Sequence, residues 1–285
     1  MGDHPQAATF DASGSGNGSE QVLGALVGDV VGSTYEFSNV KTQDFPLFPA
    51  GSCFTDDSVM TLAVAQALMD ALHHRQPIST ALVARMQELG NRHPGAGYGG
   101  RFSAWLGAAI PEPYESWGNG SAMRVSPVGW ATNSLEAAEL LAAETAKVTH
   151  NHEEGIRGAQ AVAGCIVLAR QGASNDQIRT YMHGRMGYDL DFTLDQIRPT
   201  YTFDVSCQGS VPQAVVAFLE GAHFEDVVRK AVSIGGDSDT IAAIAASIAH
   251  ARFGVPESLA RSVRAFLSPD LLAVNDGFCA AFHVD

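Results

Sequence analysis

The sequence predicts an all-α fold, a single compact orthogonal bundle of helices, and three observations support this class. Apolar residues recur at helical spacing through most of the chain after Gln21. Patterns that alternate apolar and polar residues, as half-buried strands do, are nearly absent. Neither a long linker nor a fixed repeat period divides the 285 residues, although that length alone fits one large domain or two ordinary ones.

Nine segments show the helical periodicity, and most of them are rich in Ala and end near Gly or Pro, which stop helices. Several segments are apolar nearly all round, so we expect each of these to be surrounded by other helices. The stretch YTFDVS at 201–206 is the best candidate for a strand, and it equally fits an extended link. The predicted helices cover 21–33, 58–74, 78–93, 134–148, 154–172, 175–184, 211–221, 224–232 and 239–254.

The N-terminal segment, the lack of a long apolar run and the cysteines indicate where in the cell the protein is expected. The first 19 residues end in DASGSGNGS, which offers little apolar surface to bury, so we expect a flexible tail at 1–19 and one folded domain at 20–285. No apolar run of 18 residues and no secretion signal occurs, which argues against a membrane. The four cysteines lack CxxC spacing, as is typical of a reducing compartment. The sequence therefore predicts a cytoplasmic protein, and a monomer is favoured.

The acidic balance of the chain limits its partners. Seventeen basic and 31 acidic residues give a formal net charge of −14. This charge repels phosphate backbones and anionic membranes at long range, so nucleic acid is an unlikely partner. A small phosphorylated ligand stays open, because local dipoles and bound cations can outweigh the mean field inside one cleft.

Two predicted helices begin with the same acidic pattern. In FTDDSVMTLAVAQAL, Thr55 can cap a helix whose first turn holds Asp56 and Asp57. Capping alone would explain one such start, since acids there gain about 0.3–1 kcal/mol from the helix dipole. However, GGDSDTIAAIAASIA repeats the chemistry at a second apolar helix, with the residues Asp237, Asp239 and Thr240.

Four carboxylates that met at two central helix starts would repel one another, and their pKa values would rise unless cations lay among them. The two clusters offer only oxygen donors, which favours Mg²⁺ or Mn²⁺, makes Ca²⁺ less suitable and matches Zn²⁺ poorly. This number of acids suits two ions. The sequence therefore predicts a dinuclear metal centre at the N-termini of two central helices.

The ordered motifs resemble the ADP-ribosylglycohydrolase family, which includes the dinitrogenase reductase-activating glycohydrolase and the ADP-ribosyl-arginine and ADP-ribosyl-serine hydrolases. The resemblance extends over roughly residues 21 to 254. The matching stretches are LGALVGDVVGSTYEF, FTDDSVMTLAVAQAL, GYGGRFSAW, GNGSAMRVSPVGW, THNHEEGIRGAQAVA and GGDSDTIAAIAASIA.

This resemblance implies a role for each matching residue. Glu36 matches a glutamate on a mobile segment and would transfer a proton, and Asp57 would join it as a metal-bound catalytic carboxylate. His152 would contact ribose or phosphate, although Glu153 stands where the family often has Pro and adds negative charge there. The implied metal ligands are Thr55, Asp56, Asp57, Asp237, Asp239 and Thr240, and the implied substrate-binding loop comprises Gly118, Asn119, Gly120, Ser121 and Met123.

Some residues near these motifs keep two interpretations. Arg124 could pair with phosphate or form a structural ion pair beneath the loop. Tyr98 and Phe102 could shape a pocket wall, but a role in the core is favoured. Asp204 could hold a helix end or orient a ligand.

The resemblance implies hydrolysis of the C1″ glycosidic bond between ADP-ribose and an acceptor on a protein or small molecule. An arginine acceptor is expected, as in bacterial-looking family members. The alternatives are a serine, O-acetyl or other ADP-ribosyl linkage, a two-metal phosphohydrolase, and a non-catalytic ADP-ribose-binding module.

Overall fold

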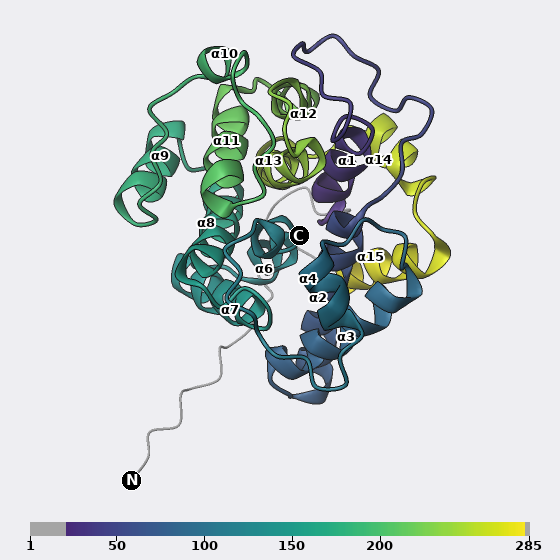
Figure 1. Cartoon of the computed structure of the whole chain (residues 1–285). Helices are drawn as coiled ribbons and strands as arrows, with labels where there is room; N and C mark the ends of the chain where they lie inside the picture. Colours follow the sequence, from purple (N-terminus) through teal and green to yellow (C-terminus); the bar gives the residue numbers. More distant parts are fainter. Residues whose placement is uncertain (1–20, 283–285) are drawn as a thin grey trace.

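The structure of the protein is a computed structural model that describes residues 21–282, so the predicted tail at 1–19 lies outside the described residues. Over the described range the chain forms helices and no strand, which confirms the all-α class (Figure 1). The segment 201–206 is an extended link with one isolated bridge, between Ser206 and Gly118. None of the helices within 21–282 has the length and apolar character that a membrane crossing requires. The helices are α1 Leu23–Gly32, α2 Asp56–His74, α3 Ile78–Arg92, α4 Gly100–Leu106, α5 Gly120–Met123, α6 Ser126–Ala131, α7 Leu135–Lys147, α8 Glu153–Arg170, α9 Asn175–Gly184, α10 Leu194–Ile197, α11 Cys207–Glu220, α12 Phe224–Ser233, α13 Ser238–Phe253, α14 Glu257–Arg264 and α15 Pro269–Ala281.

Helix α13 is the central helix of the bundle, and α1, α11 and α12 pack around it (Figure 1). Every residue of α13 from Ser238 to His250 is buried, as its apolar composition predicts. Helix α1 approaches it closely because glycines at positions 24, 28 and 32 form one face. A Cβ on Gly28 would lie 2.2 Å from the carbonyl oxygen of Ala242, and one on Gly32 would lie 2.4 Å from the Cα of Asp239. This contact brings the end of α1 to the start of α13.

Helix α2 begins as its capping residues predict. The Thr55 side chain accepts a hydrogen bond from the Asp57 N–H at 3.2 Å, and the Asp56 N–H donates to the carbonyl of Ala96 at 2.7 Å. The buried face of α2 packs against α3, α6 and α15. These contacts fix the two acids of its first turn beside the core.

All nine predicted helices are present, but their bounds and number differ from expectation. Helix α11 begins at Cys207, four residues before the predicted start, because Ser206 caps it by accepting the Gly209 N–H at 3.0 Å. The unpredicted helices α4, α5, α6 and α10 have only four to seven residues, too few to show a period. Two further helices, α14 and α15, were also not predicted. Helix α14 buries only Leu259 and Val263, a stripe of two residues that gives little sequence signal, and α15, with 13 residues, buries only four.

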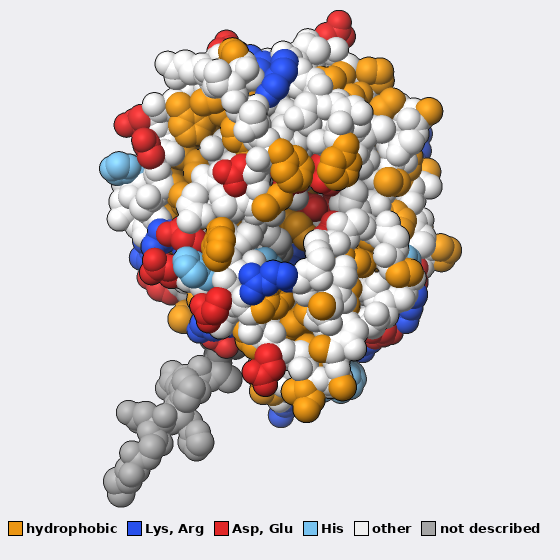
Figure 2. Space-filling view, viewed as in Figure 1, with side chains coloured by type: hydrophobic (Ala, Val, Ile, Leu, Met, Phe, Trp, Pro, Cys, Tyr) orange, Lys and Arg blue, Asp and Glu red, His pale blue; other side chains and the backbone are white. Residues whose placement is uncertain are grey.

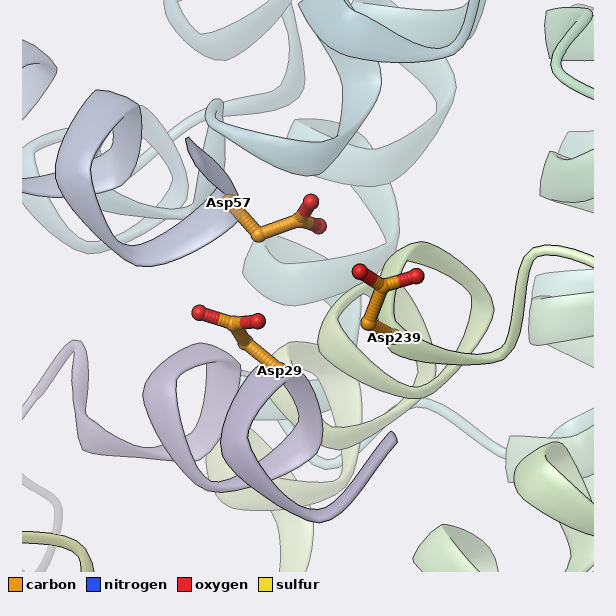
Figure 3. Close-up of side chains that lie close together, drawn as sticks. All are labelled: Asp29, Asp57 and Asp239. Atoms are coloured by element: carbon orange, nitrogen blue, oxygen red, sulfur yellow. The ribbon is translucent and has the colours of Figure 1, made fainter. Parts of the chain in front are cut away.

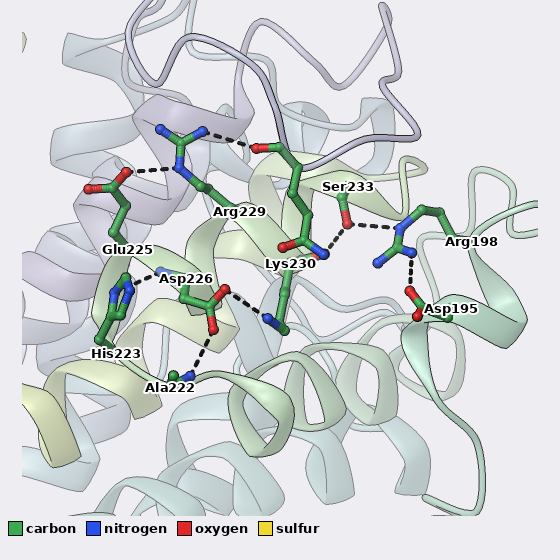
Figure 4. A network of polar contacts seen from close by, with 10 residues as sticks. Asp195, Arg198, Ala222, His223, Glu225, Asp226, Arg229, Lys230 and Ser233 are labelled. Carbon is green, nitrogen blue, oxygen red and sulfur yellow. Dashed lines mark hydrogen bonds and ion pairs between the residues drawn. The ribbon is translucent and has the colours of Figure 1, made fainter.

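The segment between α1 and α2 contains no helix, yet α12 holds it in place (Figure 4). Arg229 donates to the carbonyl oxygens of Gln43 at 3.1 Å and Phe45 at 2.8 Å. Glu225 orients this guanidinium by accepting its Nε–H at 2.8 Å. Lys41 donates to the carbonyl of Tyr201 at 2.7 Å. The segment that carries Glu36 is therefore fixed to the same part of the bundle as α13.

Candidate functional site

The two acidic helix starts open into one cavity of about 460 Å³. In the space-filling view, acidic atoms lie recessed in a hollow near the middle of the visible face, and hydrophobic side chains surround it (Figure 2). Among the described residues, the cavity wall includes neither Ser121 nor His152. The predicted site residues that line it are Glu36, Thr55, Asp56, Asp57, Gly118, Asn119, Gly120, Met123, Asp237, Asp239 and Thr240.

Carboxylates from three helices converge beside this cavity, and two of them, Asp57 and Asp239, line it. Asp29 of α1, Asp57 of α2 and Asp239 of α13 point toward one another, and one oxygen of each lies within 4.8 Å of the others (Figure 3). Glu36, Asp237 and Asp239 form a second group with the same spacing. Asp239 belongs to both groups, so the arrangement offers two adjacent positions that share one carboxylate.

Sequence reasoning missed Asp29, which is fully buried at the end of α1. Its Oδ2 accepts the backbone N–H groups of Thr55 at 2.9 Å and Ser58 at 3.0 Å, together with the Ser58 hydroxyl. Its Oδ1 accepts the Thr55 hydroxyl at 2.7 Å. Because these four bonds engage both carboxylate oxygens, Asp29 holds the start of α2 in place, and one acceptor position of its Oδ1 is left for a ligand. A single acid inside the apolar stretch LGALVGDVVG was the available signal, since an acid is rarely buried without partners.

Burial and mutual repulsion raise the pKa values of the clustered acids. Burial, followed by the neighbouring carboxylates, raises the pKa of Asp57 and of Asp239 well above the ordinary range. The same causes raise the pKa of Asp56 to about 8 and that of Glu36 to about 7. Burial raises the pKa of Asp237 to about 6, while hydrogen bonds from its neighbours oppose that rise. Without a positive partner, the cluster would therefore hold protons at neutral pH.

The residues present fit hard divalent cations. The buried Oδ1 of Asp57 has no hydrogen-bond partner in the described part of the chain. None of the ion pairs between described residues includes Glu36 or one of the clustered aspartates. Buried carboxylates without a basic partner or a complete set of hydrogen bonds call for a cation, and oxygen donors match Mg²⁺ or Mn²⁺.

Asn39 ties Glu36 to the turn that precedes α13. Its Oδ1 accepts the N–H of Gly236 at 2.7 Å, and its Nδ2 donates to the carbonyl of the same residue at 3.0 Å. That Nδ2 also donates to the carbonyl of Glu36 at 2.8 Å. Gly236 directly precedes Asp237, so the Asn39 amide connects the backbone of Glu36 to the backbone beside Asp237.

The loop that leads into α5 uses several of its polar groups for hydrogen bonds within the protein. The N–H of Gly118 donates to the Ser116 hydroxyl at 3.2 Å, and that of Asn119 donates to the carbonyl of Val205 at 2.8 Å. The Asn119 side chain donates to Asp237 at 2.6 Å, so it supports an acid of the cluster. The Ser121 hydroxyl donates to the carbonyl of Gly155 at 2.7 Å, away from the cavity.

Of the two nearby histidines, His150 lines the cavity and His152 does not. His152 caps α8 by accepting the Glu154 N–H at 3.1 Å, and its ring lies 5.7 Å from that of Trp117. His150 is 6% exposed, and a Cβ on Gly120 would lie 3.1 Å from its Nε2. The glycine therefore lets the loop approach the imidazole closely.

Basic groups line the cavity wall together with His150. Arg101 and Arg124 both contribute to this wall, and the Arg101 guanidinium lies 4.8 Å from the centre of the Tyr114 ring. Arg124 is 1% exposed and forms no ion pair with a described residue, which speaks against the interpretation as a structural ion pair. Burial lowers its pKa to about 10. The cavity thus combines acidic groups with buried positive charge.

The structure shows the contacts of two residues, Phe102 and Asp204, for which the sequence allowed two interpretations each. Phe102 lines the cavity and also stacks on Trp105 with ring centres 5.6 Å apart, so it serves both the wall and the packing. Asp204 accepts the Ser206 N–H at 2.8 Å and therefore holds the start of α11.

Comparisons with known proteins match this description. The family profile described as ADP-ribosylglycohydrolase matches residues 20–283. ADP-ribosylhydrolase ARH3 from Mus musculus is 29% identical, with 88% of each chain covered. ADP-ribosylarginine hydrolase Tri1 from Pseudomonas putida (strain GB-1) is 27% identical over 82% of this chain and 70% of its own. A solved structure titled ADP-ribosylglycohydrolase-related protein complex shares the fold, with a TM-score of 0.68 at 22% identity over 92% of this chain and 96% of that chain.

Proposed function

We propose that this chain, which belongs to the ADP-ribosylglycohydrolase family, is a metal-dependent hydrolase that removes ADP-ribose from arginine. Membership of the family supports hydrolysis of an ADP-ribosyl linkage. The observation that carries the finer proposal is the convergence of two acidic helix starts on one cavity, where Asp239 belongs to two adjacent carboxylate groups.

Two divalent cations, Mg²⁺ or Mn²⁺, would be held by the carboxylates of Asp56, Asp57, Asp237 and Asp239 and by the hydroxyls of Thr55 and Thr240. When bound, they would supply positive charge that orients the distal ribose hydroxyls and stabilises charge that develops at the reacting carbon. Asp29 and Asn119 would position these ligands, because each hydrogen-bonds to a helix start or to an acid of the cluster.

The reaction breaks the bond between C1″ of the distal ribose and the acceptor atom, and it forms a bond between C1″ and a water oxygen. A carboxylate oxygen of Glu36 would accept a proton from this water. The departing acceptor then takes up a proton, so the products are ADP-ribose and free acceptor. The contact between Asn39 and the Glu36 backbone supports this role, because it holds the glutamate segment beside Asp237 and Asp239.

The anionic part of ADP-ribose would lie near the buried positive charge of Arg124 and the imidazole of His150, beside the loop at 118–120. The positive charge of Arg124 in this part of the wall offsets the cost of desolvating a diphosphate. In this proposal His150 contacts the substrate, whereas His152 caps α8.

An arginine acceptor is supported by two observations. One similar protein is named an ADP-ribosylarginine hydrolase. In addition, Phe37 follows Glu36 and stacks on Phe203 of the cavity wall, with ring centres 6.3 Å apart and exposed fractions of 84% and 50%. Guanidinium groups stack on aromatic faces and are attracted by nearby carboxylates.

The cytoplasmic location and the monomeric state stay predictions of the sequence.

Release of free ADP-ribose from arginine-linked and serine-linked substrates tests the proposal, with Mg²⁺ or Mn²⁺ and again with a chelator. We expect metal-dependent release from the arginine-linked substrate. Release from the serine-linked substrate alone would reassign the acceptor. Phosphate, followed in parallel, would identify a phosphohydrolase if it were the only product, and the absence of both products would contradict hydrolysis of either linkage.

A further inference from the structure

A buried chain of three side chains connects the positive charge in the cavity wall to the imidazole. Arg124 donates from Nη2 to the Thr149 hydroxyl oxygen at 2.9 Å. The same hydroxyl lies 2.7 Å from Nδ1 of His150. Arg124, Thr149 and His150 are 1%, 0% and 6% exposed, so water does not replace these contacts.

The order of donors and acceptors in this chain follows from Arg124. A guanidinium only donates, so the Thr149 oxygen must accept its N–H. The one proton of that hydroxyl has no other acceptor among the described residues than Nδ1 of His150. If Nδ1 carried a proton instead, the buried hydroxyl proton would be left unpaired at a cost of about 1–3 kcal/mol. The arrangement therefore favours an unprotonated Nδ1.

An unprotonated Nδ1 fixes the other ring nitrogen as the donor. Burial, followed by the positive charges of Arg124 and Arg101, lowers the pKa of His150 well below its usual value, so the ring is neutral. A neutral imidazole with a free Nδ1 carries its proton on Nε2. Nε2 forms no hydrogen bond with the described residues, and it lies beside Gly118 and Gly120 of the cavity wall.

We infer that Arg124 and Thr149 are positioning residues that hold His150 in the Nε2–H tautomer, so that it presents a hydrogen-bond donor to an anionic or hydroxyl oxygen of the ligand. This inference rests on the proposed function for the identity of the ligand, ADP-ribose. The arrangement of the chain itself does not depend on it. Arg124 has a second anchor, because it also donates to the carbonyl of Thr145 at 3.1 Å.

The chain offers a matched pair of threonines for the test. Thr145 and Thr149 are both buried. The Thr145 hydroxyl donates to the carbonyl of Ala142 at 2.9 Å and takes no part in the chain of Arg124, Thr149 and His150. The contact of Thr145 with Arg124 uses the backbone carbonyl, which Thr145→Val retains. Thr149→Val removes the hydroxyl that connects Arg124 to His150, and Thr149→Ser keeps it.

Two readouts are measured on the Mg²⁺-loaded protein. The first is the ¹⁵N resonances of His150 in histidine-labelled protein, assigned through their loss in His150→Gln. The second is the affinity for ADP-ribose by calorimetry. We expect an unprotonated Nδ1 in the parent protein, a changed protonation pattern in Thr149→Val, and affinity about 10-fold weaker in that variant, consistent with one lost hydrogen bond. Thr149→Ser should restore both readouts, and Thr145→Val should change neither.

A proton on Nδ1 of the parent protein would overturn the inference, and this readout needs no ligand. Equal weakening by Thr145→Val and Thr149→Val would also overturn it, because the effect would then come from packing. If the parent protein released no ADP-ribose from any substrate, the proposed function would fail. The resonances would still show which nitrogen of His150 carries the proton.

Discussion

The Thr240 hydroxyl donates to Oδ2 of Asp57 at 3.2 Å and so connects two helix starts that lie 183 positions apart in the sequence. Oδ1 of Asp57 is buried and has no hydrogen-bond partner among residues 21–282. The bond also shows that the two acidic clusters do more than cap their own helices, because a side chain of the α13 start contacts a side chain of the α2 start. The opposed starts of α2 and α13 thus form one cluster of acids.

Asp57→Asn should abolish most activity and stabilise the metal-free protein. The change removes a ligand, so we expect turnover to fall by at least about 100-fold. In the metal-free protein it also removes the cost of burying and protonating Asp57 on folding, and the melting temperature should rise by about 2–4 °C for each kcal/mol of that cost. Activity and thermal unfolding in chelator measure the two effects.

Asp70→Asn on the same helix is the matched control, because Asp70 pairs with Arg85 far from the cavity. It should leave activity intact and lower the melting temperature slightly, as loss of a partly buried ion pair does. An Asp57→Asn protein with normal turnover would refute the metal site at α2.

Glu36→Gln should slow turnover by about 100-fold or more and leave the affinity for ADP-ribose within a few-fold of the parent value, since general acid–base catalysis contributes that much. Single-turnover rates and calorimetry separate the two quantities. Asp44→Asn, on the same helix-free segment but exposed, controls for loss of charge. A Glu36→Gln protein that turns over like the parent would remove Glu36 from proton transfer.

The metal-free protein should lose stability as pH rises from 6.5 to 8.5. The folded pKa values of Glu36 and Asp56, about 7 and about 8, lie above the ordinary carboxyl value, so the folded state binds more protons than the unfolded state in this window. Their ionisation therefore lowers the free energy of unfolding as pH rises. Melting temperatures in chelator should fall, and Mg²⁺ should stabilise more at pH 8.5 than at pH 6.5.

This window also limits an opposing contribution from His150 and His250. Burial lowers the folded pKa of His250 to about 4 and that of His150 well below its usual value, so these histidines destabilise the fold mainly as pH falls below the ordinary histidine value of about 6.5. A melting temperature in chelator that increased between pH 6.5 and 8.5 would contradict the raised carboxyl pKa values.

His150→Leu should weaken binding of ADP-ribose by about 10-fold, because it removes a buried donor from the cavity wall. His152→Asn should have little effect, because Asn can cap α8 as His152 does. Calorimetry with ADP-ribose compares the two variants. A larger loss in His152→Asn would return the substrate contact to His152, as the family resemblance implied.

Local chemistry made much of this fold predictable. The starts of α2 and α13 were visible because capping residues, acids and a following apolar run occur within a few positions of one another. Their convergence follows from charge, because clustered carboxylates on two apolar helices need cations to neutralise them. The predicted residues of both starts do line one cavity in the structure.

The missed features depend on packing between distant segments. Asp29 joins the cluster only because the glycine face of α1 lets that helix approach α13. The choice between His150 and His152 depends on where α8 begins, since the residue at its N-cap turns to the backbone. Boundaries of one or two residues are what periodicity specifies least.

The most direct test of the central claim is titration of the metal-free protein with Mn²⁺, followed by calorimetry and by ADP-ribose release from an arginine-linked substrate. Two cations per chain should bind, activity should rise with their occupancy, and Asp239→Asn should lose both sites because it belongs to both carboxylate groups. Full activity in chelator, or an Asp239→Asn protein that binds two cations and turns over normally, would contradict the claim.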